Sequence, residues 1–263
     1  MRYFLSRFYL AGCLLSACCV LCHCSTRQPI ALIHQTTEQA KEASRLMQKV
    51  LDTNRQVDTV KGIGSVKIMQ DGHVTSFRAA WMGSQPNKFR MEVLASTGQP
   101  ILSFASDGKR NYLLSYADNR LFKRKASEKG LERFISIVIS PEDILDLLSG
   151  RFPVCPESRA TIEYPDGNRS PVLVLYDHKR GYREKIYPKT KADSTSYRIE
   201  RYDRKGRLKY RAVSEKVREI EDARIPEQLT ISNENGAMIQ IDIKRCWVNP
   251  VVSEDRFVLN PPN

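Results

Sequence analysis

The sequence has 263 residues, of which 41% are hydrophobic, and its 42 Lys and Arg against 30 Asp and Glu give a formal net charge of +12. A domain of this length buries roughly three quarters of the surface that its unfolded chain exposes. The chain is therefore long enough to form a hydrophobic core. The positive charge favours an anionic partner, either nucleic acid or a membrane surface.

The N-terminal residues predict the export signal of a bacterial lipoprotein. Arg2 and Arg7 make a basic start, and residues 8–22 are apolar and uncharged but too short to span a bilayer. The stretch Leu15-Ser16-Ala17-Cys18 resembles the lipobox, in which small residues precede the cysteine that is acylated. We therefore predict a signal peptide over residues 1–17, lipid attachment at Cys18 and a polar tether over residues 18–35.

Three alternatives to this interpretation of the leader remain. Cys24 has enough apolar sequence before it, but His23 stands where a small residue is expected. Leu10-Ala11-Gly12-Cys13 also matches the lipobox, with too little apolar length before it. The third is a plain cleaved signal whose cysteines are incidental. Each of them still exports the chain, and export argues against a nucleic-acid partner.

Two of the seven cysteines, Cys155 and Cys246, lie outside the leader. In an oxidising compartment they could form a single disulfide. Two separate buried thiols explain the count equally well.

An amphipathic helix follows the tether. Thr36 or Thr37 can cap it, and Gln39 suits the third helical position after Thr36. Apolar residues then recur at spacings of three and four as far as Leu51. We expect a helix of about five turns that ends near Asn54 and packs on a sheet.

From Val60 the hydrophobic period changes to two, which predicts strands. The Asp71-Gly72 pair is the strongest hairpin signal, and further turns are expected at Gly98, Asp107-Gly108 and Asp118-Asn119. Strands this short joined by such tight turns predict an antiparallel meander ending at Lys123-Arg124-Lys125.

Residues 127–150 interrupt the strands with two predicted helices. Ser127 is expected to cap the first, which carries apolar residues from Leu131 to Val138. In the second, Ser140 is the expected N-cap and Asp143 the partner that completes a capping box, while Gly150 supplies the left-handed residue at the end. The apolar residues Ile144, Leu145, Leu147 and Leu148 make this second helix a plug that must lie against a sheet.

A second set of strands runs from Thr161 to Trp247, with turns expected at Asp166-Gly167, Lys205-Gly206 and Asn235-Gly236. About a dozen strands without crossover helices predict a mainly β (α+β) fold, a single curved antiparallel sheet that forms an unclosed barrel. No break in composition interrupts residues 36–263, so we predict one domain.

No motif for catalysis or cofactor binding is present in the sequence. None of the four histidines has metal-ligand spacing to a Cys, His or carboxylate, and no phosphate-binding glycine loop or nucleophile motif occurs. We expect no enzymatic activity, no cofactor and no metal.

Basic residues alternate with tyrosines over Lys179–Lys191 and Arg198–Arg211. Such a pattern can serve a nucleic-acid surface, but it is also typical of a half-exposed sheet face. For an exported chain, the functional interpretation is attraction to anionic lipid headgroups.

The order of lipobox, helix, meander, two-helix flap and second meander resembles the LolA/LolB lipoprotein carrier superfamily, and is most similar to LolB-like outer-membrane lipoproteins. The stretches that carry the resemblance are Ser140–Pro153, Phe89–Leu94 followed by Leu102-Ser103-Phe104, and Asn249-Pro250 with Phe257-Val258-Leu259.

The resemblance implies an unclosed barrel with a helical lid and an apolar cavity for the acyl chains of another lipoprotein. It also implies anchoring in the outer membrane, facing the periplasm, and receipt of clients from a periplasmic LolA-like carrier. One residue departs from the family pattern: Thr97 stands in the loop where an apolar, membrane-inserting side chain is expected.

Our first hypothesis is therefore a monomeric carrier of lipid or lipoprotein acyl chains that helps to localise lipoproteins. The alternative is an envelope scaffold that uses the same fold to dock partners and carries nothing, and a periplasmic enzyme is third. The residues predicted to line the cavity are Val66, Ile68, Phe77, Phe89, Met91, Phe104, Leu145 and Leu148.

Overall fold

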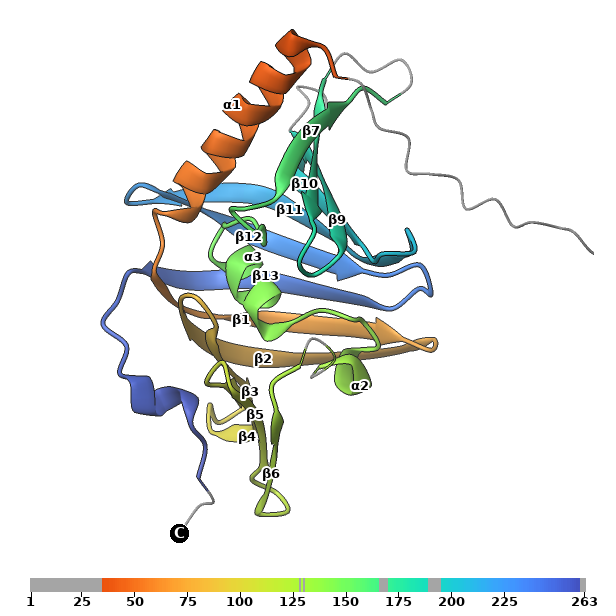
Figure 1. Cartoon of the computed structure of the whole chain (residues 1–263). Coiled ribbons are helices and arrows are strands. Elements are labelled where there is room, and N and C mark those ends of the chain that lie inside the picture. Colours follow the sequence, from red (N-terminus) through yellow and green to blue (C-terminus); the bar gives the residue numbers. More distant parts are fainter. Residues whose placement is uncertain (1–34, 128, 130, 166–169, 189–194, 261–263) are drawn as a thin grey trace, which may run out of the picture. The chain divides into compact units, whose positions relative to one another are not determined.

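The computed structural model describes residues 35–260 apart from 128, 130, 166–169 and 189–194 (Figure 1). The leader with Cys18 and Cys24, the tether up to His34 and the Asp166-Gly167 turn lie outside the described residues. All the helices, strands and core clusters of the described part lie between residues 36 and 260. We therefore expect residues 36–263 to fold when produced alone.

In the part of the chain that the structure describes, four helices accompany thirteen strands. The helices are α1 (Thr37–Asn54), α2 (Glu132–Ile135), α3 (Pro141–Leu148) and the 3-10 turn η1 (Glu254–Phe257). The strands are β1 (Thr59–Gln70), β2 (His73–Ser84), β3 (Lys88–Leu94), β4 (Pro100–Ser106), β5 (Arg110–Ser115), β6 (Arg120–Lys125), β7 (Arg159–Glu163), β8 (Val172–Asp177), β9 (Tyr182–Pro188), β10 (Thr195–Tyr202), β11 (Leu208–Ile220), β12 (Ala223–Ser232) and β13 (Met238–Val248).

All thirteen strands belong to one antiparallel sheet in the order β6-β5-β4-β3-β2-β1-β13-β12-β11-β10-β9-β8-β7. The first and last long strands, β1 and β13, pair with each other and join the two meanders. The sheet ends on β6 and β7, which do not pair with each other, so it is not closed (Figure 1). The predicted fold class, a single unclosed antiparallel sheet with helices, is confirmed.

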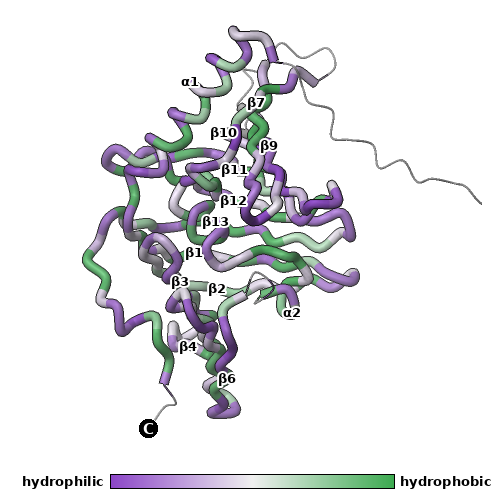
Figure 2. The backbone as a smooth tube through the Cα atoms, viewed as in Figure 1, coloured by the Kyte–Doolittle hydropathy of each residue, from purple (hydrophilic) through white to green (hydrophobic). Residues whose placement is uncertain are grey.

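The strands form where the sequence alternates. Hydrophobic and hydrophilic residues alternate along the chain in the strand regions (Figure 2). In β1 the burial also alternates, with Val60 and Val66 on the inner face. The β1–β2 hairpin turns at Asp71-Gly72, and both residues have the positive φ that a type I′ turn requires.

Helix α1 begins as the sequence predicts. The Thr36 side chain accepts a hydrogen bond from the Gln39 backbone and the Gln39 side chain accepts one from the Thr36 backbone, which completes a capping box. Its buried residues Ala43, Met47 and Val50 form one stripe. The helix packs against β7 and β8.

Helix α3 lies against β3 and β12 on the inner face of the sheet (Figure 1). It approaches β2 closely because Gly83 has no side chain: a Cβ there would collide with the Leu145 methyl groups. The helix ends at Gly150, whose φ of 71° suits glycine and whose missing Cβ leaves room for the Arg224 carbonyl oxygen. The leucines of α3 are at most 1% exposed, so the plug is fully packed.

The prediction for the first flap helix was wrong in its limits. Helix α2 is preceded by Leu131, with no side-chain cap, and ends at Ser136 in the left-handed region. Ser127 therefore does not cap it, and Val138 lies beyond it. The chain after Ser136 is extended because Ile137 and Ile139, which are at most 1% exposed, enter the core with a period of two.

The disulfide considered for Cys155 and Cys246 is not formed, since both are free thiols. The residues stand on different elements, Cys155 in the segment between α3 and β7 and Cys246 on β13. Burial raises the pKa of the Cys246 thiol to about 11, so it stays protonated at neutral pH. Among the described residues, no helix is long and apolar enough to cross a membrane.

Candidate functional site

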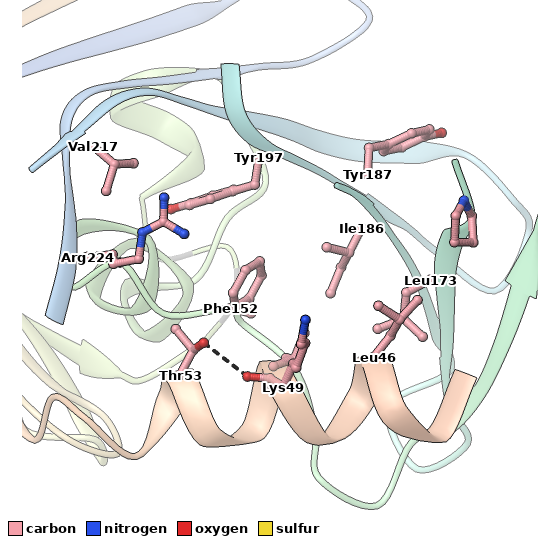
Figure 3. A pocket seen from close by; sticks show the side chains of 13 residues that line it. Leu46, Lys49, Thr53, Phe152, Leu173, Ile186, Tyr187, Tyr197, Val217 and Arg224 are labelled. Carbon is pink, nitrogen blue, oxygen red and sulfur yellow. Dashed lines mark hydrogen bonds between the residues drawn. The ribbon is translucent and has the colours of Figure 1, made fainter. Parts of the chain in front are cut away.

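A cavity of about 200 Å³ lies between α1 and the second strand meander (Figure 3). We call it the α1 cavity. Its lining residues come from α1, from the loops that flank β7 and β8, and from five strands. They are Leu46, Lys49, Val50, Thr53, Gly150, Phe152, Pro171, Leu173, Ile186, Tyr187, Tyr197, Val217 and Arg224.

The helical wall of the α1 cavity is one stripe of α1. Leu46, Lys49, Val50 and Thr53 follow each other at spacings of three and four, so they share one face. The Thr53 hydroxyl donates its hydrogen bond to the Lys49 carbonyl oxygen at 3.0 Å (Figure 3). Its proton is therefore not available to a group inside the cavity.

The sheet wall is built from cross-strand neighbours. Leu173 of β8 stands opposite Ile186 of β9 in the ladder, and both are at most 6% exposed. Tyr197 of β10 extends this wall and Val217 of β11 continues it. These side chains share a face because each strand contributes alternate residues to it.

Phe152 closes the cavity between these walls, and Asn54 at the end of α1 fixes its position. The Asn54 amide donates to the Phe152 carbonyl oxygen at 2.7 Å, and the Phe152 N–H donates to the Asn54 Oδ1 at 2.8 Å. The Phe152 ring then packs on the Tyr197 ring, with centroids 5.1 Å apart and planes at 48°. The end of α1 thereby sets the end of the cavity.

The polar groups of the cavity are few. Lys49 and Arg224 are its two charged residues and no carboxylate lines it. The Tyr197 side chain is 8% exposed, and burial raises the pKa of its hydroxyl well above the ordinary value. An apolar cavity with a few convergent polar groups is the usual form of a small-molecule site. At about 200 Å³ it is smaller than the ~300–1,000 Å³ of typical ligand pockets, so it has room for only part of a long chain.

The eight residues predicted to line a cavity lie elsewhere. Five of them are buried in the main core and three pack against it half-buried. None lines the α1 cavity, although Phe104 lines a separate hollow of about 210 Å³ beside β5, β6 and α2. The five are Val66, Phe89, Phe104, Leu145 and Leu148, and the three are Ile68, Phe77 and Met91.

The structure therefore places the cavity beneath α1 and not beneath α3. The sequence does contain signals for the actual walls: the stripe through Leu46 and Val50, and Tyr197 at the start of a run of alternating residues. The sequence pattern predicts that the stripe packs onto a sheet and that the strand carrying Tyr197 has a half-exposed face. Tyr197 is instead buried.

A buried charge cluster ties α3 to the sheet beside the α1 cavity. Its members are Asp143 of α3, Glu184 of β9, Arg201 of β10 and Tyr210 of β11. The Arg201 guanidinium bonds both carboxylates and the Pro153 carbonyl oxygen. The Tyr210 hydroxyl donates to Asp143 at 3.2 Å. Only half of the predicted capping box forms, because the Asp143 N–H meets Ser140 while its carboxylate turns to Arg201.

One guanidinium faces two carboxylates in this cluster, and the pKa values of the buried acids here are raised. Burial raises the pKa of Glu184 to about 7, with Asp143 adding to the rise and Arg201 opposing it. Burial likewise raises the pKa of Asp146, one turn further along α3, to about 6, although Arg151 opposes this. Despite burial, Asp143 and Glu184 hold the pKa of Arg201 above its ordinary value, so the guanidinium stays charged.

We expect the protein to be more stable at about pH 5 than at about pH 8. The unfolded chain releases the Glu184 proton near pH 4.3, whereas the folded protein keeps it until near pH 7. This contribution is complete below the unfolded pKa and is lost as the pH rises through the folded one. In urea unfolding, Glu184 should contribute a fall on the order of 2 kcal/mol across this range, and Glu184→Gln should remove that part. A smaller fall, from the raised pKa of Asp146, should remain in the variant.

Glu157→Gln, at an exposed ion pair with Lys179, is the control and should leave the pH dependence unchanged. If Glu184→Gln retains the full pH dependence, the assignment of the proton to Glu184 is wrong.

A larger hollow, of about 580 Å³, lies beside the charge cluster. Most of its lining is charged or polar, including Asp146, Glu184 and Arg201. An acyl chain there would remove water from charged groups without pairing them, which is unfavourable. The smaller α1 cavity is therefore the better candidate for an apolar ligand.

The fold is similar to that of solved structures from the LolA superfamily and from related lipoprotein-sorting proteins. A crystal structure of a LolA superfamily protein from Nitrosomonas europaea matches 81% of this chain and 97% of its own, with 11% identity and a TM-score of 0.53. A putative outer membrane lipoprotein-sorting protein domain from Vibrio parahaemolyticus matches 83% of this chain and 97% of its own, with 13% identity and a TM-score of 0.58. The predicted resemblance of the fold is confirmed, while LolB itself is not among these structures.

A third structure, a DUF1329 family protein from Desulfovibrio piger, has a TM-score of 0.60 and 16% identity, over 84% of this chain and 97% of its own. No protein-family model matches the sequence, and no curated protein sequence does either.

Proposed function

We propose that this protein binds the acyl chains of lipids or of other lipoproteins in the α1 cavity and carries them within the bacterial envelope. The observation that carries the proposal is an apolar cavity whose roof is a single helix, in a sheet with the LolA fold. Binding must be strong enough to extract a chain and loose enough to release it. A cavity that takes part of the chain meets both demands.

The leader supports an envelope location. Acylation at Cys18, after removal of residues 1–17, would anchor the protein in the outer membrane facing the periplasm. Acylation at the alternative Cys24 would do the same after cleavage directly before that residue. Clients would then arrive from a periplasmic LolA-like carrier, and one monomer would bind one client. Two structural neighbours, a LolA superfamily protein and a putative outer membrane lipoprotein-sorting protein domain, support this proposal.

In this proposal, release into the membrane does not use the β3–β4 hairpin. Its tip, from Ser96 to Gly98, is exposed, and Thr97 presents a hydroxyl where the family pattern has an apolar side chain. The proposal therefore covers binding and carriage, and leaves out insertion by this loop.

The proposal is tested by the lipid content of the protein. Residues 36–263, produced in the native host and extracted with organic solvent, should release lipid that mass spectrometry identifies. After removal of that lipid, the protein should take up a fluorescent fatty acid saturably, at one per chain. Absence of both co-purified lipid and uptake would contradict the carrier function.

One observation favours the alternative of a scaffold that docks partners and carries nothing. The region beneath α3 is packed solid, with Leu147 and Leu148 showing no exposed surface. A scaffold would bind neither lipid nor the fluorescent fatty acid, so the same experiment separates the two functions.

A further inference from the structure

We propose that the α1 cavity selects amphiphiles with an anionic oxygen-bearing end group, which the Tyr197 hydroxyl and the Arg224 guanidinium bind. This inference rests on the proposed function and adds the chemical class of the ligand. The shared chemistry is a carboxylate or phosphate at the end of an acyl chain.

The Tyr197 hydroxyl is a buried group without a partner. Tyr197 Oη and Ser214 Oγ both lie out of contact with solvent, and neither makes a hydrogen bond within the described part of the chain. The Ser214 hydroxyl is close enough to lower the pKa of Tyr197 against the effect of burial, but the pair does not reach hydrogen-bond geometry. Because buried hydroxyls are nearly always bonded, this one is suited to a ligand oxygen.

The Tyr197 hydroxyl is also fixed in place. Its ring packs on Phe152, which Asn54 holds through two hydrogen bonds. In Figure 3 the phenol oxygen points toward the Arg224 side chain at one end of the cavity. A hydroxyl held this way pays little entropy when it binds a ligand.

Arg224 supplies a cation at the same end. It lies at the start of β12, where its carbonyl oxygen fits over Gly150. Glu219 stands opposite it in the ladder, yet no ion pair or hydrogen bond of the Arg224 side chain occurs among the described residues. Other arginines of this meander are paired: Arg207 with Asp203, and Arg211 with Glu200.

The charge of the whole lining agrees with an anionic end group. Lys49 adds a second cation from α1, and its ammonium group points into the cavity in Figure 3. No lining residue is acidic. Lys49 and Arg224 are both exposed, so water solvates them when no ligand is bound. An ionised oxygen would gain charge-assisted hydrogen bonds from them, whereas a neutral alcohol would gain only the weaker, uncharged kind.

The test compares two ligands of equal chain length, decanoate and decanol, by calorimetric titration of delipidated residues 36–263 at neutral pH. Decanoate should bind about tenfold more tightly than decanol. Arg224→Gln and Tyr197→Phe should each weaken decanoate about tenfold and leave decanol within about twofold. Arg245→Gln, at an exposed arginine of β13 outside the cavity, is the matched control and should change neither.

Equal affinity for decanoate and decanol overturns the inference and leaves the proposed function standing. Binding of neither ligand overturns the proposed function itself. A third arm uses acetate and inorganic phosphate. If either displaces decanoate at similar concentration, the site binds free anions and the lipid source is wrong.

Discussion

Replacement of Arg201 by methionine is expected to lower the free energy of unfolding by roughly 3–5 kcal/mol. The guanidinium is 5% exposed and forms ion pairs with two carboxylates, Asp143 and Glu184, which are almost equally buried. Its removal leaves two acids close together in the interior with no cation, and both must take up protons or remain charged at high cost. Urea unfolding of residues 36–263 near neutral pH, followed by circular dichroism, measures this loss.

We attribute this loss of stability to the two carboxylates that are left buried without a cation, and not to a large net stabilisation by the ion pairs themselves. A triple variant separates these two causes. The triple variant Arg201→Met, Asp143→Asn, Glu184→Gln leaves no buried charge in the cluster and should recover most of the lost stability. Arg207→Met, at an exposed pair with Asp203, should change stability by no more than about 0.5 kcal/mol. A loss below about 1 kcal/mol for Arg201→Met would show that the cluster does not hold α3 on the sheet.

The second large effect is on ligand binding. Ile186→Trp should weaken fatty-acid uptake by at least tenfold, because the indole would occupy the α1 cavity itself. Ile186 lines the cavity opposite Leu173 and is 6% exposed. A larger side chain at this position would therefore extend into the empty volume of the cavity. Filling an existing void avoids most of the strain that enlarging a packed core residue causes. The fold should survive, as thermal unfolding will show.

Ser44→Trp is the matched control for this change. Ser44 is exposed on α1 and does not line the cavity, so an indole placed there, outside the cavity, should leave uptake unchanged. A folded Ile186→Trp protein that takes up the fatty acid like the unmodified protein would place the ligand outside the α1 cavity.

The fold was largely predictable because its signals are local. The Asp71-Gly72 turn and the alternation that follows it specify a hairpin without reference to the rest of the chain. The Thr36 and Gln39 capping box and the Ser140 N-cap depend on neighbours three residues away. Strand pairing then follows from chain order, since every pair except β1 with β13 joins strands that are consecutive along the chain.

The site was not predictable in the same way, because long-range packing positions it. Because Gly83 has no side chain, Leu145 packs directly against β2. The Leu145 side chain thereby fills space that the alternating residues of the first meander had suggested was an open cavity. The cavity opens instead where Asn54 holds Phe152, a contact between residues 98 positions apart. Asp143 shows the same limit: its backbone N–H bonds Ser140 as predicted, but its carboxylate, predicted to complete the capping box, pairs instead with Arg201, 58 positions away.

The central claim, that an acyl chain lies between α1 and the second meander, is tested most directly by a crystal structure with a fatty acid brominated at the end of its chain. The account predicts an anomalous bromine peak among Leu46, Leu173 and Ile186, with the carboxylate near Tyr197. A bromine peak beneath α3 or in the hollow beside β5 and β6, with the α1 cavity empty, would contradict it.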